Sequence, residues 1–220
     1  MAVLLLPVVP IGTEKNQQRF LSLLHSVAEE TWKEEPDCLG YCWLRSASPA
    51  DLRVCGFEMY SNPSALTETH RAGSAYGRFK DALKNERLAP PPSPDDLRFW
   101  YPVPGTLQEL TKSHGEDTPL TFLVSKYHLD TSERRDALLK ELGSAHGRSQ
   151  TTAATRIVAT TPDCHDVVTV QIVRSTETAV LVAKMEAEES RTREIGVSVT
   201  CDLWRTSSVG FLRGNVHKGN

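Results

Sequence analysis

The sequence predicts an α+β fold of two ferredoxin-like halves, each with the element order β-α-β-β-α-β. Apolar runs of strand length alternate with stretches of helical periodicity, and this order occurs twice along the 220 residues. A chain of this length suits two halves of about 100 residues each. The helices cover one face of each open sheet, and the other apolar face needs burial. We therefore expect the halves to close on each other into one αβ-barrel, the intramolecular counterpart of a dimeric αβ-barrel.

The first half is predicted to span residues 1–108. Its predicted elements are a strand at 3–11, a helix at 14–34, strands at 38–46 and 52–60, a helix at about 63–87 and a strand at 96–103. Thr13 suits the N-cap of the first helix, and Asn62 followed by Pro63 suits the start of the second. Gly73 and Gly77 lower the helix propensity of that second segment, which predicts a bend or two short helices.

The second half is predicted to span residues 117–209 and to repeat the order. Its predicted elements are a strand at 119–129, a helix that begins at 130–132, strands at 154–160 and 166–174, a helix at 177–191 and a strand at 196–204. The segment at 177–191 contains TAVLVA and can also be read as a strand. The polar stretch from Gly105 to Asp117 is interpreted as a linker, and residues 210–220 as a flexible tail.

Composition excludes several classes of function. The net charge is −3 and no stretch is dense in Lys and Arg, so we expect no nucleic-acid partner. No apolar run approaches the roughly 20 residues of a membrane span. The apolar N-terminus lacks the basic residues and cleavage site of a signal peptide, so a cytoplasmic location is predicted. The cysteines and histidines show no zinc-ligand spacing, which predicts reduced thiols and no metal site.

Residues 36–79 carry a familiar motif order. Pro36 to Tyr41 opens a strand, and the strand Phe57-Glu58-Met59-Tyr60 is followed by the segment Asn62 to Leu66 and then by His70, Ser74, Tyr76 and Phe79. This order resembles the antibiotic biosynthesis monooxygenase family of dimeric αβ-barrels. The motif match covers roughly half of the chain. The second half matches by topology only and lacks counterparts of His70 and Glu58, so we interpret it as a degenerate copy whose site has been lost.

The resemblance implies a pocket between the helices and the sheet. It also implies aromatic polyketide substrates of secondary metabolism, oxidised by O2 without metal, flavin or other cofactor. The haem-degrading branch of the fold has a Trp before its His in the second helix, and this sequence has none there. Fold alone does not fix function, because the same scaffold also carries cyclases and isomerases.

Three residues are the candidate catalytic groups. A neutral imidazole at His70 can take a phenolic or C–H proton near neutral pH. Glu58, in an apolar strand, is expected to orient His70 or to hold a substrate hydroxyl. Tyr76 is expected to donate a hydrogen bond to a substrate carbonyl. Simple packing or a surface ion pair remains the alternative for each of the three.

Four residues are the candidate substrate-binding groups. Tyr41 and Trp43 alternate onto one face of a strand and are expected to form a flat wall for a planar ring. Trp100 in the fourth strand and His25 on the first helix are the other two. Core packing is the alternative reading of the aromatic residues.

The leading hypothesis for function is a cofactor-independent monooxygenase that oxidises an anthrone or phenolic substrate with O2. One alternative is a non-oxidative polyketide cyclase, isomerase or decarboxylase on the same scaffold. The other is a ligand-binding barrel without catalysis. The small aromatic substrate and O2 are the expected partners, and the sequence is compatible with a monomer or a homodimer.

Overall fold

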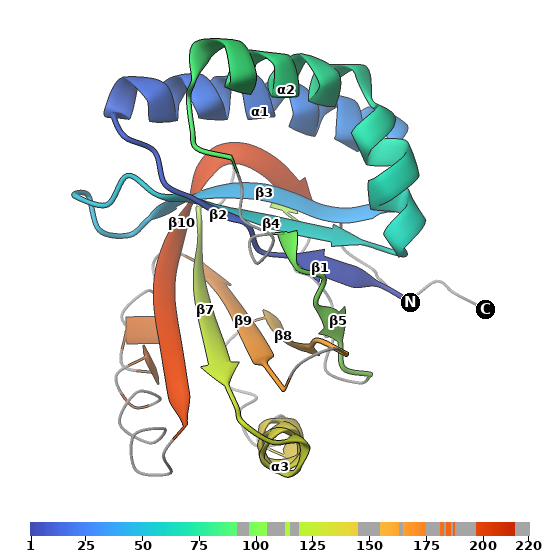
Figure 1. The fold of residues 1–220 in the computed structure, drawn as a ribbon, viewed down its shortest axis with the longest axis vertical. Coiled ribbons are helices and arrows are strands. Elements are labelled where there is room, and N and C mark those ends of the chain that lie inside the picture. The colour runs from blue at the N-terminus through green and yellow to red at the C-terminus, as the bar shows by residue number, and fades with distance from the viewer. Residues whose placement is uncertain are drawn as a thin grey trace. The chain divides into compact units, whose positions relative to one another are not determined.

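The computed structural model describes residues 1–91, 97–104, 113–114, 119–144, 155–162, 165–174, 181–182, 184–185, 187 and 197–213. The chain divides into two compact units. The first consists of residues 1–99, 110–118 and 205–220, and the second of residues 100–109 and 119–204. Both units combine helices with a sheet, as an α+β fold requires (Figure 1).

The first unit places two helices against a sheet. Its elements are β1 (Val3–Leu5), β2 (Val8–Val9), α1 (Glu14–Glu34), β3 (Cys38–Ser46), β4 (Val54–Tyr60), the π-helical turn η1 (Ala65–Thr69), the 3-10 turn η2 (His70–Ala72), α2 (Ser74–Glu86), β6 (Ser113–His114) and the C-terminal part of β10 (Ser198–Leu212). The strand order is β1-β4-β3-β10, with β2 also paired to β4 and β6 to β10. Helices α1 and α2 lie side by side over β3 and β4 (Figure 1).

The predicted strand at 3–11 is divided by Pro7 into β1 and β2. Proline has no N–H to donate to a neighbouring strand, so the ladder is interrupted there. The carbonyl oxygen of Pro7 still accepts a hydrogen bond from the backbone N–H of Gly56, at 2.9 Å. Both short strands pair antiparallel with β4, which keeps them in one sheet.

Helix α1 has the predicted bounds, and Thr13 is its N-cap. The Thr13 hydroxyl accepts a hydrogen bond from the backbone N–H of Asn16 at 3.1 Å. The buried side chains of α1 recur at helical spacing: Gln17, Phe20, Leu21, Leu24, Val27, Ala28 and Thr31. This stripe faces the sheet and continues to Glu35, which is also buried.

The predicted second helix at 63–87 is broken into η1, η2 and α2. Asn62 caps its start, because its side-chain oxygen accepts a hydrogen bond from the backbone N–H of Ala65 at 2.9 Å. The helix breaks at Gly73, as the low propensity of glycine predicts. The carboxylate of Glu30 then caps α2 by accepting hydrogen bonds from the Ala75 N–H at 3.0 Å and from the Ser74 hydroxyl at 2.7 Å. These bonds fix the direction of α2 after the break.

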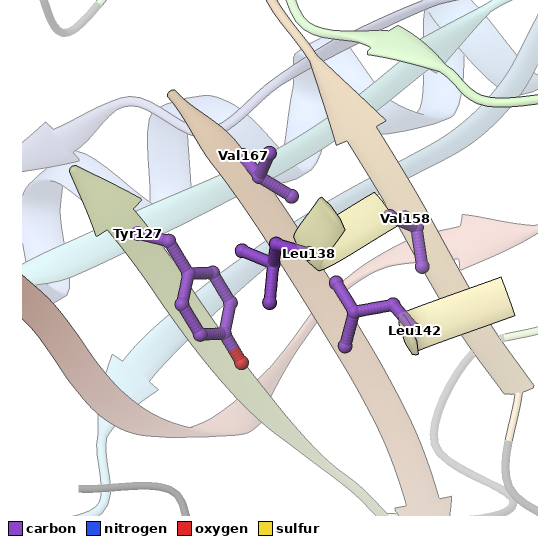
Figure 2. Packing of buried hydrophobic residues seen from close by; sticks show 5 residues of the cluster. All are labelled: Tyr127, Leu138, Leu142, Val158 and Val167. Carbon is purple, nitrogen blue, oxygen red and sulfur yellow. The ribbon is translucent and has the colours of Figure 1, made fainter. Parts of the chain in front are cut away.

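The second unit contains β5 (Tyr101–Pro102), β7 (Leu120–His128), α3 (Ser132–Ser144), β8 (Thr155–Thr160), β9 (Val167–Arg174) and the N-terminal part of β10. Its strand order is β10-β7-β9-β8-β5. Figure 2 shows how Leu138 and Leu142 of α3 pack on Tyr127, Val158 and Val167 of the sheet. Each leucine is 4% exposed, and its burial contributes about 2 kcal/mol. A second cluster joins Leu123, Val173 and Leu181.

Two strands depart from the sequence prediction. Of the described residues of the strand predicted at 96–103, Tyr101–Pro102 form β5, which pairs with β8 in the second unit. The flanking Trp100 forms an isolated bridge, and the N–H of Val103 donates to the carbonyl of Val158 at 2.9 Å. The last strand, predicted at 196–204, extends to Leu212, so the prediction of a flexible tail is wrong for residues 210–213. Phe211 and Leu212 are 3% and 1% exposed. Burial of these two apolar side chains and pairing with β3 and β6 stabilise the extension.

Several predictions fall partly or wholly outside the described residues. Of the predicted linker, residues Ser113–His114 form β6, and the rest lies outside. The described residues of the segment 177–191 are helical rather than extended: Leu181, Val182, Lys184, Met185 and Ala187. His146 and Cys164, which belong to the histidines and cysteines without zinc-ligand spacing, lie outside the described residues, as does Ala145 at the predicted end of the helix that begins at 130–132. Of the cysteines that the structure describes, Cys38, Cys42, Cys55 and Cys201 form no disulfide bond. Among the described residues, no helix has the length and apolar character needed to cross a membrane.

Candidate functional site

His70 lies buried in the first unit and is paired with a carboxylate. The residue is 2% exposed, and its Nδ1 lies 3.0 Å and 3.1 Å from the two carboxylate oxygens of Glu35. The Thr31 hydroxyl donates to Glu35 Oε1 at 3.0 Å and also lies 3.3 Å from Nδ1. A carboxylate only accepts hydrogen bonds, so we assign a proton to Nδ1. Glu35 therefore fixes both the orientation and the tautomer of the imidazole.

Irregular backbone brings these residues together. Glu35 is the C-cap residue of α1, one turn beyond Thr31 on the same buried stripe. His70 stands at the junction of η1 and η2, and π-helical turns of this kind occur frequently at functional sites. The backbone N–H of Gly73 donates to the carbonyl of His70 at 3.0 Å, which closes the short turn before α2 begins. A continuous helix would have carried the side chains of His70 and Tyr76 to different faces.

Aromatic side chains surround the imidazole. The ring of His70 lies 5.4 Å from Tyr41, 5.7 Å from Tyr60 and 5.1 Å from Tyr76, measured between centroids. Four further ring pairs have centroid distances of 5.3–6.4 Å: Tyr41–Trp43, Trp43–Phe20, Phe20–Phe79 and Phe79–Tyr76. The six members, here called the aromatic cluster, are Phe20, Tyr41, Trp43, His70, Tyr76 and Phe79. Tyr76 is the member that is partly exposed.

Glu58 is the second buried carboxyl group of the site. It stands opposite Tyr41 in the β3–β4 ladder, is 8% exposed, and accepts a hydrogen bond from the Tyr60 hydroxyl at 3.1 Å. Burial raises the pKa of Glu58, although His70, the Tyr60 hydrogen bond and Arg71 partly oppose the shift. Because burial favours the neutral acid, Glu58 is suited to donate a proton or a hydrogen bond.

Three tyrosines keep their hydroxyl protons in this environment. Burial, followed by the nearby charge of Glu58, raises the pKa of Tyr41 and of Tyr60 well above 10. The same two causes raise the pKa of Tyr76. All three hydroxyls are therefore hydrogen-bond donors at neutral pH rather than bases. This leaves the imidazole of His70 as the group suited to accept a proton.

The indole N–H of Trp43 is a further buried donor. Trp43 is 5% exposed, and among the described residues its Nε1 makes no hydrogen bond of good geometry. The indole lies near the Tyr41 hydroxyl, where it opposes the rise of that pKa. A buried donor of this kind favours a polar partner from elsewhere.

The structure brings together five of the seven predicted site residues: His70, Glu58, Tyr76, Tyr41 and Trp43. His25 lies instead on the exposed side of α1, where its ring faces Glu29 at 3.6 Å. Trp100 is 4% exposed and belongs to the second unit, whereas His70 belongs to the first.

Sequence reasoning missed Glu35, Thr31 and Tyr60. A signal for Glu35 exists, because the apolar stripe of α1 at positions 24, 27, 28 and 31 continues to position 35. A carboxyl group on a buried stripe needs a partner. In the part of the chain that the structure describes, no group of three or more His, Cys, Asp or Glu side chains is arranged to hold a metal ion.

The fold resembles that of several solved structures. A proposed monooxygenase from Fusobacterium nucleatum matches with a TM-score of 0.71 and 11% identity, over 98% of this chain and 96% of that one. A proposed monooxygenase from Lactobacillus acidophilus NCFM matches with a TM-score of 0.65 and 13% identity, over 96% and 98%. An anthrone oxidase-like protein matches with a TM-score of 0.62 and 11% identity, over 99% and 95%.

These matches confirm the predicted fold class, α+β of the αβ-barrel type. At such low identity they show the fold alone. No protein-family model matches the sequence, and no curated protein matches it significantly.

Proposed function

We propose that this chain is a cofactor-independent monooxygenase that oxidises an anthrone or a related phenolic, polyketide-like compound with O2. The observation that carries the proposal is the buried Glu35–His70 pair inside the aromatic cluster. The pair supplies a base with a fixed tautomer, and the rings supply flat apolar surfaces for a fused aromatic substrate. The likeness to monooxygenase-type structures supports the same reading at the level of the fold.

The reaction begins with proton abstraction. Glu35 accepts from Nδ1–H, so the Nε2 lone pair of His70 takes a proton from the acidic methylene of the substrate. The resulting carbanion gives its electrons to O2, and a C–O bond forms as a hydroperoxide. Loss of the second methylene hydrogen together with hydroxide breaks the O–O bond and yields the ketone and water. One anthrone and one O2 thus give one quinone and one H2O.

The remaining polar residues have roles in substrate binding. As the methylene loses its proton, negative charge develops on the substrate carbonyl oxygen. Donors preorganised toward that oxygen stabilise the transition state. The Tyr76 hydroxyl is the proposed donor, and the Glu58 carboxyl group is a second donor in its protonated form, which burial favours. Tyr41 and Trp43 are proposed to form the wall against which the ring lies. His70 is 2% exposed and Tyr76 is the partly exposed ring beside it, so the proposal includes movement of Tyr76 when the substrate enters.

A turnover assay in air and under argon tests this function. The protein is incubated with a panel of anthrones and phenolic polyketides, and products are identified by mass spectrometry. The proposal predicts a product with one additional oxygen atom and two fewer hydrogen atoms, formed in air and not under argon. An isomeric or dehydrated product formed equally in both gases would assign the same base to a non-oxidative cyclase or isomerase and would refute the oxygenase proposal.

A matched pair of variants links turnover to the site. His70→Ala removes the proposed base. His128→Ala removes an exposed histidine, 3.3 Å from Asp166, that also pairs with a carboxylate but lies in the second unit. The proposal predicts that turnover falls at least a hundredfold in His70→Ala and stays within about twofold of wild type in His128→Ala. Equal rates in the two variants would contradict it.

A further inference from the structure

The C-terminus of helix α1 is held by a residue from the far end of the chain. The Arg213 guanidinium donates hydrogen bonds to four backbone carbonyl oxygens, three in the last turn of α1 and one at Cys38, the first residue of β3. They belong to Trp32 at 2.7 Å, Cys38 at 2.8 Å, Thr31 at 3.2 Å and Glu35 at 3.4 Å. The last carbonyls of a helix have no partner within it, and a cation there also interacts favourably with the helix dipole.

Arg213 is itself fixed in place. Its guanidinium carbon lies 4.3 Å from the ring centroid of Trp32 and 4.9 Å from that of Phe211, at distances of cation–π contacts. Its backbone N–H donates to the carbonyl of Leu39 at 2.9 Å, directly after strand β10 ends. The preceding Leu212 is 1% exposed. The side chain therefore has little freedom to leave the helix end.

Two of the four carbonyls belong to residues that contact the imidazole. The side chains of Thr31 and Glu35 contact Nδ1 of His70, and their main chains are the ones that Arg213 binds. We propose that Arg213 is a positioning residue: it holds the last turn of α1 so that Glu35 and Thr31 meet His70 in one geometry. The relevance of Arg213 to catalysis rests on the proposed function, whereas its effect on the geometry around His70 does not.

The geometry requires arginine in particular. A planar guanidinium reaches several acceptors at once and stacks on aromatic rings, whereas a lysine ammonium is a compact point charge on a flexible stem. Arg213→Lys keeps the charge at the helix end and loses the fork and the stacking. Arg213→Ala loses all three. The two variants therefore separate the effect of charge from the effect of geometry.

The Nδ1–H proton of His70 reports the geometry directly. In the purified protein this proton, bound between the ring and Glu35, gives a downfield proton NMR signal, assigned by its absence from His70→Gln. Its exchange with solvent is measured in wild type, Arg213→Lys, Arg213→Ala and Arg19→Ala. Arg19 is the control because it also holds α1, through a bidentate pair with Glu86 on α2, and lies away from the helix C-terminus.

The proposal predicts that exchange accelerates at least tenfold in Arg213→Ala, by an intermediate factor in Arg213→Lys, and less than twofold in Arg19→Ala. Unchanged exchange in both Arg213 variants overturns it. Equal acceleration in Arg19→Ala also overturns it, because general loosening of α1 would then suffice. If Arg213→Ala does not fold, Arg213→Lys decides the question. Accelerated exchange in a protein without oxygenase turnover would retain the positioning role and reject the proposed function.

Discussion

Replacing Glu35 by Gln tests the proposed base most selectively, because the side chain keeps its size and loses its charge. The carboxylate lies 3.0–3.1 Å from Nδ1 through both oxygens, in a site where Glu35 is 6% exposed. A hydrogen bond to a charged group of this kind contributes about 1.5–3 kcal/mol. An amide N–H can also donate to Nδ1, which would place the imidazole proton on Nε2 and remove the basic lone pair. Loss of the correct tautomer in a comparable His–carboxylate pair lowers kcat on the order of 10⁴-fold.

We therefore expect Glu35→Gln to lower kcat by about 10³- to 10⁴-fold. We expect it to lower the free energy of unfolding by only about 1–3 kcal/mol. Steady-state oxygen consumption gives kcat, and urea unfolding followed by tryptophan fluorescence gives stability. Glu34→Gln is the matched control, because Glu34 is the adjacent residue and is exposed. A folded Glu35→Gln protein whose kcat falls less than about threefold would refute the role of Glu35 as the orienting group.

Two further predictions concern stability. A Cβ at Gly210, where φ is +122°, would lie 1.9 Å from the carbonyl oxygen of Tyr41, so Gly210→Ala is expected to lower the free energy of unfolding by about 3 kcal/mol or more. At Gly77 on α2 no atom lies within 4 Å of such a Cβ, so Gly77→Ala is expected to raise the free energy of unfolding by about 0.5–1 kcal/mol. Urea unfolding measures both variants, and equal effects of the two substitutions would contradict the packing described. Burial raises the pKa of Glu58 above its ordinary value of 4.5. Above pH 4.5 the folded state therefore binds more protons than the unfolded chain, and the free energy of unfolding falls as pH rises through the folded pKa. Glu58→Gln should therefore be more stable than wild type at pH 7, with a difference that shrinks toward pH 4, and a difference independent of pH would show that Glu58 is not shifted.

The sequence was informative where local pattern decides structure. The periodicity of α1, the cap at Thr13 and the break at Gly73 follow from side-chain spacing and propensity, and the structure has all three. The strands at 38–46 and 52–60 were also predicted, and in the structure they pair so that Tyr41 stands opposite Glu58. For the same reason, five candidate site residues from one stretch of the chain come together.

The sequence was not informative where the partner lies far along the chain. Glu35 is 35 positions from His70, and Arg213 is 178 positions from Glu35. The stripe of α1 favours Glu35 over its exposed neighbour Glu34 as the buried carboxylate, but nothing near Glu35 in the sequence identifies His70 as its partner. The extension of β10 follows from burial of Phe211 and Leu212 against β3, a tertiary contact that propensity does not encode. Arg213 consequently fell within the predicted flexible tail.

Hydrogen–deuterium exchange of the substrate under argon measures proton abstraction by His70 alone, because it separates this step from the reaction with O2. An anthrone is incubated in D2O with wild type, His70→Ala or buffer, and deuterium at the acidic methylene is measured by mass spectrometry. Wild type is expected to accelerate exchange above the buffer rate, and His70→Ala is expected to return it to that rate. Equal acceleration by His70→Ala, or no acceleration by a wild-type protein that forms quinone in air, would contradict the assignment of His70 as the base.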